Sequence, residues 1–554
     1  MSFLFRERWR SLVAALVCLA FIQLLTLWHY RGPAPKSSDV ADTEFSAERA
    51  VSVHEELFPA KPHPAGTVEN LIVRDRLVDL LRNLGWTVEE QMAVVESDAK
   101  VVLYNVLARM PGLELRNDQR PLVLATHYDS CRTGPGAADA GGCVAALIEA
   151  SRALAAGVDS LDAPNLVRPV YLLFTDGEEL GLLGASQFVK RHPLSAKKPI
   201  VLNFDARGTS GPVVMYETHA GNRAAIEAWG NELARPRITG SLFTAVYRTL
   251  PNGSDFTVFQ QDGWQGFNFA IIDGAHRYHQ PDDTLANLDR RSLQHFGEHA
   301  LKLARRIATT ETELAESRDD AAFFDVLGLF VVSYPLWWCL PLSIAAFIVI
   351  TLTNWRRACV PAGLQTFLRL GLCGLIVGFS SAFVGWFLSR LLRETGALPR
   401  SFVWYGSFLM IGLWIVSAAM SLGVAHWLLR HRSAEQTWSS VWLWWSFAGI
   451  SMATIAPEFS HLLLAPTLLA AGLSLSHWSV TTRTLLVTFS SAILLVPVEH
   501  LLSIALGPTN GILLNPVFAL LLVPTYPLVA YPPTDSLPAG PLNISVARRS
   551  ASRT

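Results

Sequence analysis

The sequence predicts an α/β domain of three layers, built on a mixed, mostly parallel β-sheet, with a membrane anchor before it and an all-α transmembrane bundle after it. Three observations predict this fold. Short apolar runs alternate with helix-like segments over residues 47–315, as in βαβ units. Residues 323–532 are strongly apolar, and a separate apolar stretch lies near the N-terminus.

The composition indicates contact with lipid. Hydrophobic residues make up 51% of the 554-residue chain, which is too apolar for a purely soluble protein. The formal net charge is −1, so the chain has no strong electrostatic attraction for nucleic acid. We therefore expect a lipid bilayer as a partner and exclude a nucleic-acid-binding protein.

The N-terminal apolar segment predicts a membrane anchor. Residues 11–28 follow three arginines in the first ten positions, and their number approaches the roughly 20 residues that cross a bilayer. A cleaved signal peptide is the alternative, but the sequence WHYR at 28–31 lacks the small residues of a cleavage site. We predict a cytoplasmic tail and anchor over residues 1–30, followed by a linker over 31–46 that is rich in proline, serine and charge.

Residues 47–315 are the expected α/β domain. Apolar runs bounded by turn-forming residues predict its strands. The predicted strands are 101–108, 122–125, 170–174, 200–204, 213–216 and 266–271. The predicted helices between and around them are 67–84, 144–154, 185–191, 222–233 and 291–309.

Metal-compatible side chains follow these strands. His127 stands just after the strand over 122–125, where the ligand sites of open α/β sheets collect. Asp129 lies two residues further on and can orient the imidazole. Asp205 follows the strand over 200–204 in the same way.

Three further positions complete the set. Asp139 follows a Gly-Pro-Gly turn, Glu178 and Glu179 follow a strand, and His279 lies on a loop. Each residue alone has a commonplace explanation: a surface pair, a helix cap, a solvated face or a loop acid. Together they suit two zinc ions, which need one bridging carboxylate and roughly two further N or O ligands each. The set therefore indicates a hydrolase.

The residues around these positions resemble a known family. The stretches HYDS, PGAADAGGC, DGEELGLLGA, NFDARGTSGP, GSDF and YHQPDDT are similar to the M28 zinc metallopeptidases. They are especially similar to the membrane-embedded branch that includes endoplasmic-reticulum metallopeptidase and vacuolar membrane protease. The resemblance covers residues 47–307 and implies the zinc-exopeptidase fold, two zinc ions per chain and a peptide substrate.

The resemblance also implies a role for each ligand. His127 and Asp205 would bind one zinc ion, Glu179 and His279 the other, and Asp139 would bridge them. The family often has Asp-Asp-Asn around the bridging residue, whereas this chain has Ala-Asp-Ala. The bridge is retained, and the hydrogen bonds beside it are expected to differ.

Three catalytic residues are implied as well. Glu178 would be the general base that takes a proton from zinc-activated water. Asp129 would orient the imidazole of His127 without binding zinc itself. Tyr278 would stabilise the tetrahedral oxyanion, with a packed aromatic side chain as the alternative.

The expected function is that of a membrane-anchored two-zinc metallopeptidase, an aminopeptidase that removes N-terminal residues from peptides. Two alternatives within the fold are a catalytically inactive receptor or scaffold and a single-zinc enzyme similar to glutaminyl cyclase. A transporter with an appended peptidase is a third reading. Its spans show few ionisable groups, mainly Glu458 and Glu499, whereas a solute path needs such groups.

The region 323–532 predicts seven spans by the roughly 20-residue rule. They are 331–352, 367–388, 403–428, 441–456, 461–475, 485–506 and 512–531. A buried soluble helical domain is the alternative, but so many apolar runs could not all be enclosed. Residues 533–554 form the expected C-terminal tail.

Loop charges orient these spans. With the first arginines in the cytoplasm, most basic loops fall on the same side, although the loop holding Arg390, Arg393 and Arg400 does not. The protein is therefore expected to be a multi-pass membrane protein. Its peptidase domain would lie on the non-cytoplasmic face, periplasmic in a bacterium or lumenal in an organelle.

Cys131 and Cys143 are the cysteines of the expected peptidase domain. A disulfide between them is open, because spacing alone does not establish bonding geometry. The oligomeric state and the preferred substrate residue are open as well.

Overall fold

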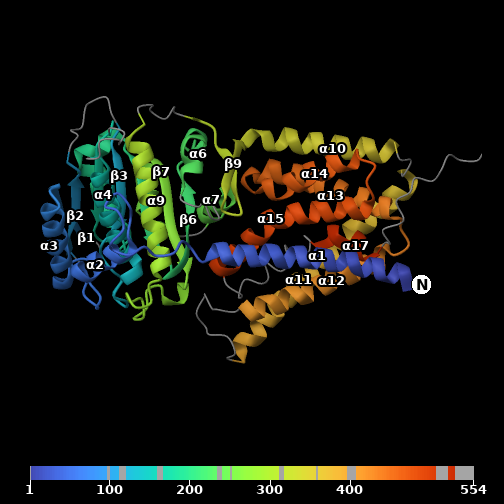
Figure 1. Ribbon diagram of the computed structural model, residues 1–554, viewed down its shortest axis with the longest axis horizontal. Coiled ribbons are helices and arrows are strands. Elements are labelled where there is room, and N and C mark those ends of the chain that lie inside the picture. The colour runs from blue at the N-terminus through green and yellow to red at the C-terminus, as the bar shows by residue number, and fades with distance from the viewer. Residues whose placement is uncertain are drawn as a thin grey trace, which may run out of the picture.

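The structure is a computed structural model of the chain (Figure 1). It describes residues 2–96, 100–111, 120–158, 166–233, 240–249, 252–310, 317–356, 360–395, 407–506 and 522–530. The sheet and the helices around it form one end of the molecule, and the long apolar helices form the other end (Figure 1). The predicted tail 533–554, residues 512–521 and 531 of the last predicted span, and residues 403–406 of the third predicted span lie outside these ranges.

A seven-stranded mixed sheet forms the centre of the α/β part, in the order β1-β2-β4-β3-β5-β7-β6. Strands β4, β3, β5 and β7 are parallel neighbours, and the other pairings are antiparallel. The strands are β1 Thr87–Glu96, β2 Lys100–Arg109, β3 Leu122–His127, β4 Val170–Thr175, β5 Ile200–Ala206, β6 Ser210–Thr218 and β7 Gln265–Asp273. All six predicted strands are confirmed.

Strand β1 is not among the predicted strands. Half of its ten residues are polar, and most are exposed or half-buried, because the strand lies at the edge of the sheet with one neighbour. An apolar run predicts a buried strand, and an edge strand need not carry one. Strands β3 and β4 are buried along their whole length, as expected for parallel strands covered on both faces.

Helices cover both faces of the sheet, so the predicted three layers are confirmed. On β3, Leu122 and Leu124 pack in one hydrophobic cluster with α2, α4 and α9, while Val123 and Ala125 pack in a second cluster with α5 and α8. The helices of this part are α2 Ala47–Leu57, α3 Val68–Asn83, α4 Cys143–Val158, α5 Leu183–Arg191, α6 Arg223–Trp229, α7 Ser241–Arg248, α8 Asp255–Gln261 and α9 Arg290–Ala308.

The second part consists mainly of long apolar helices. They are α1 Ser2–Tyr30, α10 Cys339–Arg356, α11 Val360–Glu394, α12 Ser407–Leu429, α13 Ala434–Ile455, α14 His461–Ser474, α15 Val480–Leu506 and the short α17 Tyr526–Ala530. Among the described residues, three helices are long and apolar enough to cross a membrane: Leu336–Trp355, Phe367–Leu388 and Val480–Leu502. Shorter apolar helices are Val17–Tyr30, Ile415–Leu429 and His461–Ser474.

The first predicted span begins too early. Residues 331–335 belong to strand β9 Phe330–Pro335, which pairs with β8 Ala321–Val326 in an antiparallel hairpin. The apolar and aromatic residues at this point are compatible with a strand as well as with a membrane helix. The apolar run alone therefore does not distinguish the two structures. The helix begins only after this hairpin.

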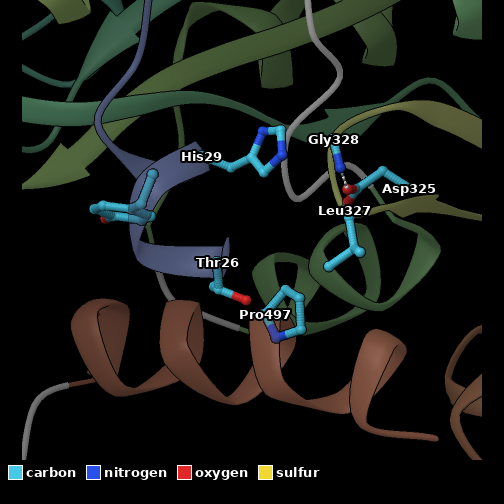
Figure 2. A pocket seen from close by; sticks show the side chains of 7 residues that line it. Thr26, His29, Asp325, Leu327, Gly328 and Pro497 are labelled. Atoms are coloured by element: carbon cyan, nitrogen blue, oxygen red, sulfur yellow. Dashed lines mark hydrogen bonds between the residues drawn. The ribbon is translucent and has the colours of Figure 1, made fainter. Parts of the chain in front are cut away.

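The two parts meet at the hairpin and at the C-terminal end of α1. Helix α1 packs along α15, and Ser241 of α7 donates a hydrogen bond of 3.0 Å to the carbonyl of Glu458. Figure 2 shows Thr26 and His29 of α1, the hairpin turn and Pro497 of α15 around a cavity of about 20 Å³, about the size of one water molecule. The α/β part is thus seated directly on the helices.

Candidate metal centre

Neighbouring parallel strands bring the first site residues together. Strand β3 lies between β4 and β5, and all three run in the same direction. His127 ends β3, Asp205 lies at the end of β5, and Glu178 and Glu179 follow β4. The carboxyl ends of the strands form one edge, so residues more than fifty positions apart in sequence become neighbours there.

The first group of possible ligands is formed by His127, Asp139 and Asp205, which can surround one metal ion. The Nε2 atom of His127 lies 3.1 Å from Asp139 Oδ1 and 3.6 Å from Asp205 Oδ1. His127 and Asp139 are buried, and Asp205 is half-buried.

A second group lies on the other side of Asp139. The Nε2 atom of His279 is 3.3 Å from Asp139 Oδ2 and 3.0 Å from Glu179 Oε1. The two carboxylate oxygens of Asp139 therefore face two different imidazoles. This is the position that the sequence assigned to a bridging ligand.

These distances fit metal coordination. Two N or O atoms bound at about 2.0–2.1 Å to one tetrahedral zinc ion lie about 3.3 Å apart, and the four distances range from 3.0 to 3.6 Å. Glu179 Oε1 and His279 Nε2 are buried and make no hydrogen bond, although they are 3.0 Å apart. Two buried polar atoms in this arrangement are satisfied by a shared cation.

The protonation behaviour of the cluster also fits a cation. Burial raises the pKa of Glu178 well above its usual range and raises the pKa of Glu179. Burial lowers the pKa of His279, but Asp139 and Glu179 outweigh it and raise the pKa to about 10. Protons thus offset the crowded negative charge in this site, and metal ions do the same when they replace protons.

Asp129 supports both sides of the site. Its Oδ1 accepts a hydrogen bond of 3.1 Å from the amide of Glu178, and its Oδ2 accepts one of 3.3 Å from the amide of Glu179. Oδ1 also lies 3.5 Å from Nδ1 of His127. One buried carboxylate therefore fixes the end of β3 against the turn after β4.

We expect Asp129→Asn to weaken zinc binding by about 10–100-fold, as loss of a supporting group typically does. The amide keeps the shape of the carboxylate but lacks one of the two acceptor oxygens for the backbone amides. The measurement is competition with a chelator on the full chain. The control is Asp75→Asn, since the Asp75 side chain is 64% exposed on α3; equal zinc affinity in both variants would contradict a supporting role.

Asp139 is held by a residue of the last loop. Asp283 Oδ1 accepts a hydrogen bond of 2.9 Å from the amide of Ala138, and its Oδ2 accepts one of 3.4 Å from the amide of Asp139. The peptide bond between Asp139 and Ala140 is cis. The two hydrogen bonds of Asp283 hold the loop that carries Asp139 against the loop that carries His279.

His279 has a left-handed backbone conformation, with φ of +58°, which is uncommon for a residue other than glycine. Thr133 donates a hydrogen bond of 2.6 Å to its carbonyl. The ring of Tyr278 stacks on the His279 ring, with centroids 3.7 Å apart, and is 36% exposed. Strained conformations of this kind cluster at functional sites, where the surrounding structure maintains them.

The structure thus brings together all eight predicted site residues. It also adds Asp283, Asp255 and Cys131, to which the sequence assigned no role. Asp255 is buried at the start of α8 and accepts a hydrogen bond from the hydroxyl of Thr175. Asp283 and Asp255 belong to the stretches YHQPDDT and GSDF, which resemble the family, so the sequence could have indicated them as site residues. For Cys131 the only such indication was its position on the loop after His127.

The α/β fold and the two groups of acidic and imidazole ligands define a candidate metallohydrolase. Residues 105–304 match Peptidase family M28. This match falls on the segment whose motifs resemble that family.

The chain is a distant homologue of endoplasmic reticulum metallopeptidase 1 and of vacuolar membrane protease. It is 24% identical over 427 residues to endoplasmic reticulum metallopeptidase 1 of Mus musculus, covering 72% of this chain and 46% of that protein. It is 26% identical over 359 residues to the vacuolar membrane protease of Eremothecium gossypii, covering 59% of this chain and 33% of that protein. The matches span less than half the length of these relatives.

Solved structures overlap with the α/β part. The glutaminyl cyclase of Porphyromonas gingivalis has 18% identity and a TM-score of 0.39, covering 48% of this chain and 98% of that chain. The aminopeptidase from Aneurinibacillus sp. strain AM-1 has 14% identity and a TM-score of 0.39, covering 50% and 98%. At these TM-scores neither structure bears on the activity.

Proposed function

We propose that this chain is a membrane-anchored aminopeptidase that uses two zinc ions. The observation that carries the proposal is the position of the Asp139 carboxylate, with Oδ1 3.1 Å from His127 Nε2 and Oδ2 3.3 Å from His279 Nε2. A carboxylate placed in this way can bind two ions at once. Paired metal ions occur in aminopeptidases as well as in phosphatases, polymerases and nucleases, and the resemblance to M28 peptidases favours the first of these.

Five residues would hold the two ions. His127 and Asp205 would hold one ion, Glu179 and His279 would hold the other, and Asp139 would contact both. When bound, zinc polarises the scissile carbonyl and makes a nucleophile available from water near neutral pH.

Glu178 moves the proton in the proposed reaction. It lies in the turn after β4, where Asp129 accepts a hydrogen bond from its backbone amide. Its carboxyl group interacts electrostatically with His127, Asp205 and Asp139. Burial raises its pKa, which suits a carboxylate that accepts a proton from the attacking water and passes it to the leaving amine. Asp129 acts as a positioning residue, because it contacts His127 and the Glu178–Glu179 backbone.

Tyr278 is placed for contact with substrate. Its ring stacks on His279 and is partly exposed. In this position its hydroxyl can donate to the oxyanion that develops on the substrate carbonyl, as hydrogen-bond donors do in acyl-transfer enzymes.

The membrane part anchors the enzyme. We propose eight spans, formed by α1 and the seven predicted segments, the first of these now beginning at Leu336 after strand β9. The first arginines lie in the cytoplasm and the peptidase domain lies on the opposite face. The supporting observations are the three helices long enough to span and the position of the α/β part at one end of the helices (Figure 1). The opposite face is periplasmic in a bacterium and lumenal in an organelle.

The test uses the full chain in detergent and a series of fluorogenic aminoacyl substrates. We expect release of the N-terminal residue, loss of activity with a zinc chelator and recovery with added zinc. The matched control is the same series with acetylated amines, which an aminopeptidase does not cleave. Cyclisation of N-terminal glutamine without hydrolysis would support a glutaminyl-cyclase-like enzyme, and protein that binds no zinc and cleaves nothing would support a receptor or scaffold.

A further inference from the structure

A thiol lies beside the second group of possible ligands. The Sγ atom of Cys131 and the ligand atoms of Glu179 and His279 all lie within 4.8 Å of one another. Cys131 is a half-buried free cysteine on the loop after β3. It is a sulfur donor in a set otherwise made of nitrogen and oxygen.

The loop that carries Cys131 is fixed on both sides. The hydroxyl of Ser130 accepts a hydrogen bond of 2.8 Å from the amide of His63. On the other side, Thr133 donates its hydroxyl proton to the carbonyl of His279 at 2.6 Å. A Cβ on Gly134 would lie 2.4 Å from the carbonyl oxygen of Gln280, so the two loops are in close contact there. The loop that carries Cys131 is therefore held against the loop that carries His279.

The second group has room for another ligand. Glu179, His279 and the shared Asp139 give three donors to this ion, and zinc usually takes four. Glu179 Oε1 and His279 Nε2 are buried without a hydrogen bond, and the Glu179 side chain is only 10% exposed. These two atoms are 3.0 Å apart, and both lie within 4.8 Å of the Cys131 thiol.

The distances allow a sulfur ligand. Sulfur at about 2.3 Å and nitrogen or oxygen at about 2.0 Å from one tetrahedral zinc ion lie about 3.6 Å apart. The observed separations are at most 4.8 Å, so rotation of the Cys131 side chain closes the remaining gap. Sγ also contacts Thr133 Oγ1 at 3.4 Å and the carbonyl oxygen of Gly134 at 4.0 Å. Both are weak interactions that the side chain can give up.

We propose that Cys131 Sγ is a further ligand of the metal ion held by Glu179 and His279. The inference rests on the proposed two-zinc centre and adds a donor to it. On binding, the thiol releases one proton to solvent and the thiolate donates an electron pair to the ion. A thiolate favours zinc, cobalt and cadmium over magnesium and manganese, so this position would be selective for thiophilic ions.

The test is absorption spectroscopy of the cobalt-loaded full chain, together with alkylation of Cys131 by iodoacetamide, followed by mass spectrometry. We expect a sulfur-to-cobalt charge-transfer band in the near ultraviolet in the wild type and not in Cys131→Ser. Zinc should slow alkylation of Cys131 by about tenfold or more, while Cys131→Ser should weaken the second zinc ion by about 10–100-fold. Cys18→Ser is the matched control, because Cys18 is also half-buried but lies on α1.

The outcomes separate this inference from the proposed function. A wild type that binds two metal ions but lacks the band, with alkylation of Cys131 unaffected by zinc, would overturn the thiolate ligand and leave the two-zinc centre standing. A wild type that binds no metal would overturn both. If Cys131→Ser is poorly folded, the band and the protection of the wild-type thiol still decide the matter.

Discussion

Replacing Glu178 with glutamine is expected to lower kcat for N-terminal residue release by about 10²–10⁴-fold, the usual contribution of a general acid–base. Glutamine has nearly the same shape as glutamate but can neither accept nor return a proton. Because the five proposed metal ligands are untouched, the variant should bind the same amount of zinc. It should also keep its KM within a small factor, since the loss falls on the chemical step.

The measurement is steady-state kinetics on the best aminoacyl substrate, with zinc content determined on the same samples. Glu227→Gln is the matched control, since Glu227 is 48% exposed on α6 and pairs with Arg223. A Glu178→Gln variant that retains wild-type kcat with two zinc ions bound would remove Glu178 from the mechanism. Loss of zinc in the same variant would instead identify Glu178 as a ligand.

Changing the shared aspartate, Asp139→Asn, is expected to lower zinc content from two ions per chain to one or fewer and to abolish hydrolysis. The reason is geometric. The two oxygens of Asp139 face different imidazoles, whereas asparagine offers one oxygen and an amide nitrogen that cannot bind a cation. The neutral side chain also removes one negative charge from between the two ions.

Thermal stability gives a second readout that does not depend on substrate. A ligand that binds only the folded state at about 100 times its Kd stabilises it by about 2.7 kcal/mol, so added zinc should raise the Tm of the wild type. The rise should be much smaller in Asp139→Asn. The control is Asp42→Asn, since the Asp42 side chain is 85% exposed; an equal rise in Asp139→Asn would exclude a bridging role.

The C-terminal helices show how well an apolar sequence pattern predicts membrane-spanning segments. The predicted span 367–388 coincides with a helix long enough to cross a bilayer, and 485–506 overlaps another. The pattern failed at 331–335, which form strand β9. Pairing with β8 satisfies the backbone of this segment, and that pairing depends on a partner strand which local hydrophobicity does not report.

The sequence by itself determined six of the seven strands of the main sheet, the order of the metal-compatible residues and the strong apolar character of residues 323–532. Parallel strands buried on both faces are marked by apolar runs, and the residues that end such runs share one edge of the sheet. Residue order and apolar pattern are therefore sufficient to predict that His127 and Asp205 lie near each other.

Only the tertiary structure decided how the loops meet at that edge. The contacts of Asp283 with the Asp139 loop, of Asp129 with the Glu178 and Glu179 amides, and of the Cys131 loop with His279 join distant segments through single hydrogen bonds or close backbone packing. Such contacts depend on the relative position of whole strands and loops, and residue type and local periodicity do not encode that position.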